Sequence, residues 1–175
     1  MSPAAPAAPD ASLVGLRWAI KHSFLDYVAK TPDGRAYVDQ GASVTASNDL
    51  VFPPRQARLK GAAGGVDTYE FGGEVHFVAY GGMLYVRIGD PVIHVCGGAG
   101  RLTVRSVDDA DRSIRVELAT FTVGDTGSGV AGPTQWHATD VRLAAEGVPV
   151  FADVYSTGEP LAPLQVRLPD AQACG

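Results

Sequence analysis

The sequence predicts an α+β domain in which an N-terminal helix packs on a mostly antiparallel, two-sheet β structure. Apolar residues recur at three- and four-residue steps between Leu13 and Val28, which is the spacing of an amphipathic helix. After that helix, short alternating segments are separated by turn residues, as in antiparallel strands. The 21 glycines and 12 prolines also argue for many turns and against an all-helical fold.

The length of 175 residues suits one domain with a single hydrophobic core. We expect a flexible, Pro- and Ala-rich lead over residues 1–11 and one domain over residues 12–170. The formal net charge of -5, with scattered Lys and Arg, argues against a nucleic-acid partner. Because neither a secretory signal nor a membrane span is recognisable, the chain as given predicts a cytoplasmic protein, or an exported one whose signal was removed.

The first expected element is a helix from about Leu13 to Ala29, with Ser12 as its N-cap. The segment at residues 31–34, Thr-Pro-Asp-Gly, ends it because neither proline nor an Asp-Gly turn continues an α-helix. Ser23 and Tyr27 lie one turn apart along one edge of the apolar stripe. We expect this stripe to pack against strand side chains, where small-molecule pockets tend to form.

The remaining elements are expected to be strands. The strongest pair, residues 68–80 and 83–96, is joined at Gly81-Gly82, which predicts a two-residue type I′ hairpin turn. A second hairpin is expected to turn near Gly147. The other expected strands are residues 42–52, 55–60, 101–107, 113–123, 137–146, 148–156 and 164–168.

The common catalytic signatures are absent from the sequence. It contains no Gly-x-Ser-x-Gly elbow, no His-Glu-x-x-His, no phosphate loop and no dinucleotide fingerprint. The spacing of its four histidines, His22, His76, His94 and His137, does not predict a shared site. Cys96 has no companion ligand at zinc spacing, so we expect a buried structural thiol and no disulfide scaffold.

Tyr27 has two interpretations. A phenol that faces a cavity can ligate a metal, above all haem iron, whereas a core tyrosine packs its ring and sends its hydroxyl to water or a carbonyl. Tyr80, just before the glycine turn, can present its phenol to the helix. On an ideal strand His76 and Tyr80 point to the same face, but they lie about 13 Å apart along the strand, at roughly 3.3 Å per residue. They therefore cannot act at one point.

Several segments, in this order, resemble the HtaA haem-binding domain of actinobacterial haem uptake. They are residues 18–28 (WAIKHSFLDYV), 72–84 (GGEVHFVAYGGML), 90–93 (DPVI), 97–102 (GGAGRL) and 151–164 (FADVYSTGEPLAPL). The resemblance spans about Leu16 to Leu168. It implies a helix-plus-sheets fold in which a helix tyrosine ligates haem iron, a serine one turn earlier lies near the porphyrin, and a histidine hydrogen-bonds the ligating phenol.

The resemblance implies haem as the cofactor and iron bound by Tyr27. Ser23 matches the serine position, and Ser23 and Phe151 are expected at the pocket wall. Tyr80 stands where the family pattern has histidine, as hydrogen-bond partner or second ligand. A phenol binds ferric iron as phenolate, so its pKa near 10 must be lowered by the iron and by a hydrogen-bond donor. Tyr80 can donate, but unlike histidine it does not titrate near neutral pH.

Different classes of function remain open at this stage. The first is a haem carrier or buffer whose partner is haem or another small hydrophobic ligand. A homodimer is compatible with this function. The alternative is a cytosolic enzyme of specialised metabolism that reuses the pocket without haem, with Tyr27, Tyr80 and His76 as hydrogen-bonding or acid/base groups. A third is an interaction module without a ligand. The sequence names no substrate and does not decide whether the protein is an enzyme.

Overall fold

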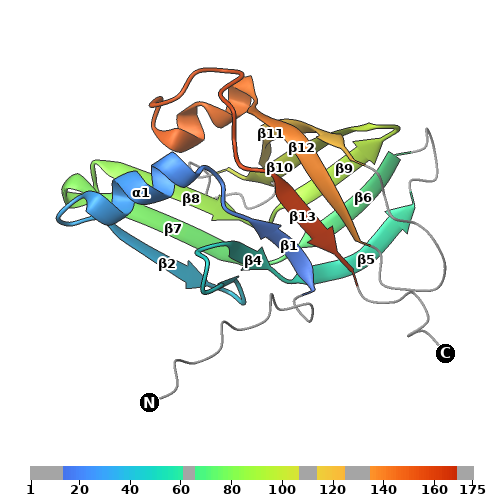
Figure 1. The fold of residues 1–175 in the computed structure, drawn as a ribbon, viewed down its shortest axis with the longest axis horizontal. Helices are drawn as coiled ribbons and strands as arrows, with labels where there is room; N and C mark the ends of the chain where they lie inside the picture. Colours follow the sequence, from blue (N-terminus) through green and yellow to red (C-terminus); the bar gives the residue numbers. More distant parts are fainter. Residues whose placement is uncertain (1–13, 61–65, 107–113, 125–134, 169–175) are drawn as a thin grey trace, which may run out of the picture.

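The computed structural model describes residues 14–60, 66–106, 114–124 and 135–168. Strands dominate these residues and form two antiparallel sheets (Figure 1). The expected α+β class, with an N-terminal helix packed on a β domain, is therefore wrong: the described residues are mostly β, and they begin with a strand. The expected N-cap Ser12 and the lead over residues 1–11 lie outside the described residues.

The first described element is a strand, β1 (Gly15–Trp18), where the sequence predicts helix. Leu16 and Trp18 are buried on one face and Arg17 points to the other, which is the two-residue period of a strand. The indole nitrogen of Trp18 donates to the Ala162 carbonyl at 2.8 Å. Leu16 and Ile20 fit both a helical and a strand period, and pairing with β4 and β13 selects the strand.

The helix α1 (His22–Lys30) is consequently only nine residues long. It buries Phe24 and Val28, and the Phe24 ring meets the Phe77 ring edge-on at 5.1 Å. Ile20, with a φ of 61°, turns the chain between β1 and α1. The predicted end of the helix is confirmed, because the Thr31 amide and hydroxyl both donate to the last turn.

The larger sheet has ten strands within the described residues, in the order β3-β4-β1-β13-β12-β11-β10-β9-β6-β5. Every adjacent pair is antiparallel, and the alternate residues on its inner face supply much of the core. Besides β1, its strands are β3 (Ser43–Val44), β4 (Leu50–Phe52), β5 (Pro54–Lys60), β6 (Val66–Phe71), β9 (Val92–Cys96), β10 (Ala99–Arg105), β11 (Arg115–Val123), β12 (Gln135–Leu143) and β13 (Leu164–Arg167).

The smaller sheet has the order β2-β7-β8 and carries α1 on its inner face. Its strands are β2 (Arg35–Asp39), β7 (Glu74–Ala79) and β8 (Leu84–Gly89). Val75, Phe77 and Ala79 alternate toward the core and are at most 1% exposed. Figure 1 shows α1 running beside β7 and β8, so the helix, the end of β7 and the β7–β8 turn come together.

The two longest predicted strands each break in the middle. Residues 68–80 divide at Gly72-Gly73 into β6 and β7, and residues 83–96 divide at Asp90-Pro91 into β8 and β9. The corners are adjacent, because the Asp90 amide donates to the Gly73 carbonyl at 2.9 Å. A Cβ at Gly73 would lie 2.8 Å from the Ala42 side chain. These corners send each strand pair from one sheet into the other.

Two predicted turns also differ. Residues 148–156 form no strand; the chain makes 3-10 turns η2 (Ala145–Gly147) and η3 (Pro149–Phe151), as suits a proline at the first position of a turn. The β7–β8 turn has four residues rather than two, because Ala79 pairs with Leu84. Its first three residues form η1 (Tyr80–Gly82) and all have positive φ. Among the described residues, no helix has the length and apolar character to cross a membrane.

Candidate functional site: a paired-tyrosine surface

The structure brings Tyr27 of α1 together with Tyr80 of η1. Their hydroxyl oxygens lie 2.6 Å apart and their ring centroids 6.2 Å apart. Either hydroxyl can be the donor in this hydrogen bond. Tyr27 is 45% exposed and Tyr80 50% exposed, so neither packs its ring in the core. The pair presents two phenol oxygens at the surface.

Asp33 holds Tyr80 in place from the turn that follows α1. Its carboxylate accepts hydrogen bonds from the Tyr80 amide at 3.0 Å and the Gly81 amide at 2.7 Å. The hydrogen bond from the Gly81 amide is the main cause that holds the pKa of Asp33 below its ordinary value, and the one from the Tyr80 amide is the second. Tyr80 has a φ of 53°, which is uncommon for a residue with a side chain. These two hydrogen bonds, called the Asp33 clasp below, support this conformation and so direct the Tyr80 ring toward Tyr27.

An aromatic cluster lies beneath the helix and supports its position. Phe151 is fully buried and meets Phe24 at 5.5 Å and Tyr155 at 5.8 Å, both edge-on. Phe24 in turn contacts Phe77 of the smaller sheet. Phe151, expected at a pocket wall, therefore lies in the core and anchors α1 against η3.

Ser23 is exposed on α1, one turn before Tyr27. Burial raises the pKa of the Tyr155 phenol, and the charge of Lys21 and then the Ser23 side chain oppose this rise. Lys21 lies over the same ring, with its Nζ 5.4 Å from the centroid, and pairs with Glu159 at 2.9 Å. Tyr155, which was not singled out from the sequence, thereby links Ser23 to the η3 segment.

The pKa of Tyr27 is raised above its ordinary value. The hydrogen bond to Tyr80 is the largest cause, followed by partial desolvation and by the charges that Tyr80 and Tyr155 would carry when ionised. Tyr27 is therefore a neutral phenol at neutral pH in the free protein. Its proton must leave before the oxygen can bind a metal ion.

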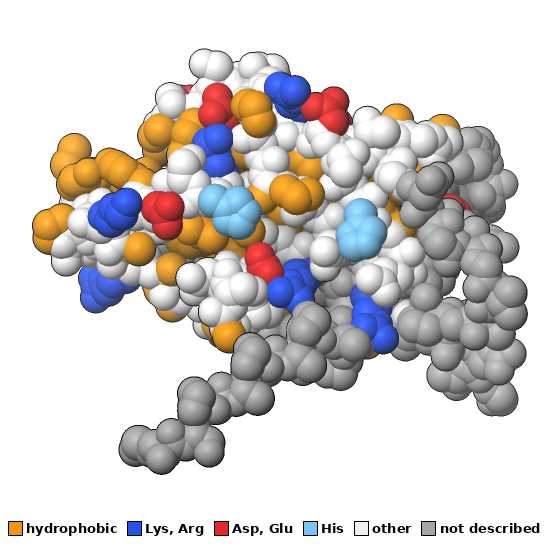
Figure 2. Space-filling view, viewed as in Figure 1, with side chains coloured by type: hydrophobic (Ala, Val, Ile, Leu, Met, Phe, Trp, Pro, Cys, Tyr) orange, Lys and Arg blue, Asp and Glu red, His pale blue; other side chains and the backbone are white. Residues whose placement is uncertain are grey.

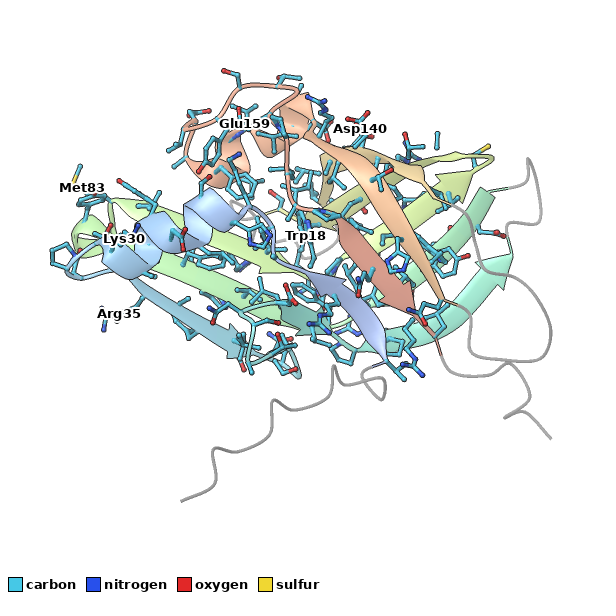
Figure 3. The ribbon with its side chains drawn as sticks, in the orientation of Figure 1. Trp18, Lys30, Arg35, Met83, Asp140 and Glu159 are labelled. Atoms are coloured by element: carbon cyan, nitrogen blue, oxygen red, sulfur yellow. The ribbon has the colours of Figure 1, made fainter. Side chains whose placement is uncertain are left out.

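The surface near the pair is apolar and open. Met83 is 88% exposed and follows Tyr80 by three residues, with its amide bonded to the Tyr80 carbonyl. Figure 2 shows hydrophobic side chains gathered at the end of the molecule formed by α1 and the β7–β8 turn. Figure 3 labels Met83 and Lys30 at that end. Val154, which follows η3 by three residues, is another exposed apolar side chain, at 59%.

His76 lies on the opposite face of β7 from Phe77. Its Nε2 is 3.2 Å from Glu74 and its Nδ1 is 2.9 Å from the Tyr85 hydroxyl, while its ring stacks on Tyr37 at 4.5 Å. Both ring nitrogens thus have partners. None of the described contacts joins His76 to Tyr27 or Tyr80, so the structure does not bring these three groups together.

The cysteine and histidine of β9 form no metal centre in the part of the chain that the structure describes. No group of three or more His, Cys, Asp or Glu residues there could hold a metal ion. Cys96 is exposed, so its expected role as a buried structural thiol is wrong. It occupies the last position of its strand, beyond the buried part of the sheet.

The described fold and site define a two-sheet antiparallel β domain with a paired-tyrosine surface between a short helix and a hairpin turn. The family model HtaA, described as Htaa, matches residues 14–167. The chain therefore belongs to the HtaA family.

Solved structures from Corynebacterium glutamicum share the fold. The C-terminal domain of HtaA has 22% identity and a TM-score of 0.70, covering 87% of this chain and 94% of that chain. The N-terminal domain of HtaA has 22% identity and a TM-score of 0.65, covering 87% and 95%. The haem-binding protein HtaB has 20% identity and a TM-score of 0.60, covering 89% and 91%. No curated protein sequence gives a significant match.

Proposed function

We propose that this protein binds haem, with Tyr27 as an axial ligand of ferric iron and Tyr80 as its hydrogen-bond partner. The observation that carries the proposal is the 2.6 Å contact between the two exposed hydroxyls. Membership of the HtaA family and a shared fold with a protein described as haem-binding add support.

The donor set fits the cofactor. Tyrosine oxygen is a known axial ligand of haem iron. Nearly half of the Tyr27 surface is exposed, so a flat ligand can approach from solvent. Met83, whose amide is bonded to the Tyr80 carbonyl, offers an exposed apolar contact for a porphyrin close to the pair. Bound haem would supply a ferric centre that favours the phenolate form of Tyr27.

The two tyrosines have different roles: Tyr27 loses its proton when it ligates iron, and Tyr80 donates a hydrogen bond. In the free protein the neutral Tyr27 is favoured by its hydrogen bond to Tyr80. Ligation requires the Tyr27 proton to leave, after which the Tyr80 hydroxyl can rotate and donate to the phenolate. Ser23, one turn earlier, places a second hydroxyl on the same helix. Haem affinity should therefore rise with pH while Tyr27 is protonated in the free protein.

Tyr80 stands where the family pattern has histidine, so we expect this site to respond differently to pH. A histidine donor gains a proton near neutral pH, whereas a phenol does not titrate in that range. We infer a carrier or buffer whose haem affinity falls with acid only through protonation of Tyr27, without the additional loss that a titrating histidine partner would cause.

The alternative enzyme function gains no support from His76. Its partners are Glu74, Tyr85 and Tyr37, and none of the described contacts joins it to the tyrosine pair.

Titration of the protein with haemin, followed by resonance Raman spectroscopy of the ferric complex, tests the proposed function. We expect saturation at one haem per chain and vibrations of an iron–phenolate bond. Non-saturable binding, or a complex without these vibrations, would contradict tyrosine ligation.

A further inference from the structure

A concave site lies on the outer face of the larger sheet and uses neither tyrosine of the pair. It is a cavity of about 340 Å³ lined by side chains of β5, β6, β9, β10 and β11 and by the corner residue Asp90. On β6 and β9 the lining residues Thr68, Glu70, Val92 and His94 alternate with residues that face the core. The volume is that of a site for a small molecule.

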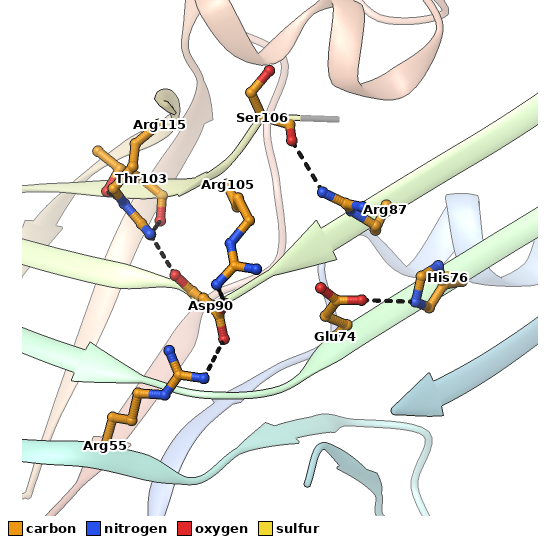
Figure 4. Close-up of polar contacts among 9 residues, drawn as sticks. All are labelled: Arg55, Glu74, His76, Arg87, Asp90, Thr103, Arg105, Ser106 and Arg115. Carbon is orange, nitrogen blue, oxygen red and sulfur yellow. Dashed lines mark hydrogen bonds and ion pairs between the residues drawn. The ribbon is translucent and has the colours of Figure 1, made fainter. Parts of the chain in front are cut away.

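Three arginines converge on Asp90 at the floor of this cavity, as Figure 4 shows. Asp90 is only 2% exposed. Arg105 pairs with its Oδ2, and Arg55 Nη2 lies 3.3 Å from its Oδ1. Arg115 donates instead to the Asp90 backbone carbonyl. The buried Asp90 carboxylate is therefore shared by Arg55 and Arg105. Arg115 contacts only the main chain of Asp90.

Arg115 has neutral hydrogen-bond partners. Besides the Asp90 carbonyl, it donates to the Thr103 carbonyl at 3.0 Å and the Thr103 hydroxyl at 3.1 Å. Burial and the nearby Arg105 lower its pKa, and Glu70 opposes them. Among the described residues of the lining, three are arginines and two, Glu70 and Asp90, carry carboxylates. A partly buried positive charge without a full countercharge is costly, although the whole chain carries -5.

We propose that this cavity binds a small oxyanion with at least two negative charges, a phosphate or a polycarboxylate. Guanidinium groups recognise both kinds of oxygen through paired, charge-assisted hydrogen bonds. Arg55, whose side chain is 53% exposed, provides the accessible donor, and Arg115 provides the charge that Asp90 does not neutralise. The anion offers Arg115 a negative charge, which its printed partners, the Thr103 hydroxyl and the Thr103 and Asp90 carbonyls, do not supply. The site is independent of haem binding.

Isothermal titration of the purified protein with pyrophosphate and with citrate, at constant ionic strength in chloride, tests this site. We expect saturable binding, with amide shifts in NMR spectra centred on Thr68, Val92 and His94. Tighter binding of pyrophosphate supports a phosphate ligand, and tighter binding of citrate supports a carboxylate. Absence of saturable binding of either anion up to about 10 mM would overturn the proposal.

Arg55→Gln is the informative variant because Arg55 is the most exposed of the three arginines. Losing one charge-assisted donor should weaken anion binding about tenfold or more. Arg142→Gln is the matched control, since Arg142 is a half-exposed arginine of β12 whose partner is Asp140. The control should bind like wild type. Equal affinity in Arg55→Gln and wild type, with unchanged melting temperatures, contradicts the assigned site.

Discussion

The hydroxyl groups of Tyr27 and Tyr80 meet at 2.6 Å across 53 residues of chain. One phenol comes from a nine-residue helix and the other from a hairpin turn of positive φ. Asp33, which follows the helix, connects the helix to this turn because its carboxylate accepts hydrogen bonds from the turn amides. The proposed haem site therefore depends on this turn as much as on the helix.

Substitutions of Tyr80 separate its proposed role as donor from a role in packing. Tyr80→Phe keeps the ring but removes the hydroxyl, so haem affinity should fall about tenfold to a hundredfold through loss of one hydrogen bond to a charged oxygen. Tyr80→His should restore a donor and add a titration near pH 6.5. Haemin affinities measured from pH 5.5 to 8 check both. An acid response in wild type equal to that of Tyr80→His would contradict the account.

The Asp33 clasp predicts an effect that needs no haem. Asp33→Asn removes the charge that strengthens both amide contacts, so hydrogen exchange at Gly81 should accelerate several-fold. Because the pKa of Asp33 is lowered, its stabilisation is present above the unfolded value near 3.9 and is lost as pH falls through the folded pKa. Exchange in wild type should approach that of the variant in this acid range. Asp140→Asn, at an exposed ion pair, is the control.

Phe151 is expected to contribute stability and not direct contact with haem. Phe151→Ala removes a fully buried ring packed on Phe24 and should destabilise the protein by about 3–5 kcal/mol. Val154→Ala, at a 59% exposed position nearby, should change the free energy of unfolding by less than about 0.5 kcal/mol. Urea denaturation measures both. Similar small losses in the two variants would show that η3 does not anchor α1.

The raised pKa of Tyr27 predicts a loss of stability in alkali. A group whose pKa is higher in the folded state stabilises that state below its unfolded pKa and loses this contribution as pH rises. The stabilisation should therefore persist up to about pH 9 and decline above pH 10. Tyr27→Phe should show a shallower decline in urea midpoints over this range. Parallel curves for wild type and variant would rule out the coupling between the phenols.

Part of the site could be predicted from sequence. A tyrosine beside a glycine turn and a tyrosine on a short helix are local features, and the order of segments resembles the HtaA family. The role of Asp33 was not predicted: its Asp-Gly turn was visible, but its amide partners lie 47 and 48 residues away. Tyr155 lies in a segment of resemblance, yet only the fold brings its hydroxyl to Ser23.

The fold errors have identifiable physical causes. At β1 the apolar residues fit two periods, and only pairing with distant strands selects one. The corners at Gly72-Gly73 and Asp90-Pro91 interrupt runs whose apolar alternation continues on both sides, so local patterning hides the change of sheet. Strand β2 is largely exposed, and its three apolar residues, Ala36, Tyr37 and Val38, are consecutive, so it shows no apolar–polar alternation that would predict a strand.

The central claim is that Tyr27 ligates haem iron, and difference absorption spectroscopy of haemin titrations tests it most directly. Wild type and Tyr27→Phe should be compared with Tyr37→Phe, which removes a similarly exposed hydroxyl from β2. We predict a ferric–phenolate spectrum in wild type and Tyr37→Phe, and its loss with at least about tenfold weaker binding in Tyr27→Phe. The same spectrum and affinity in Tyr27→Phe would contradict the account.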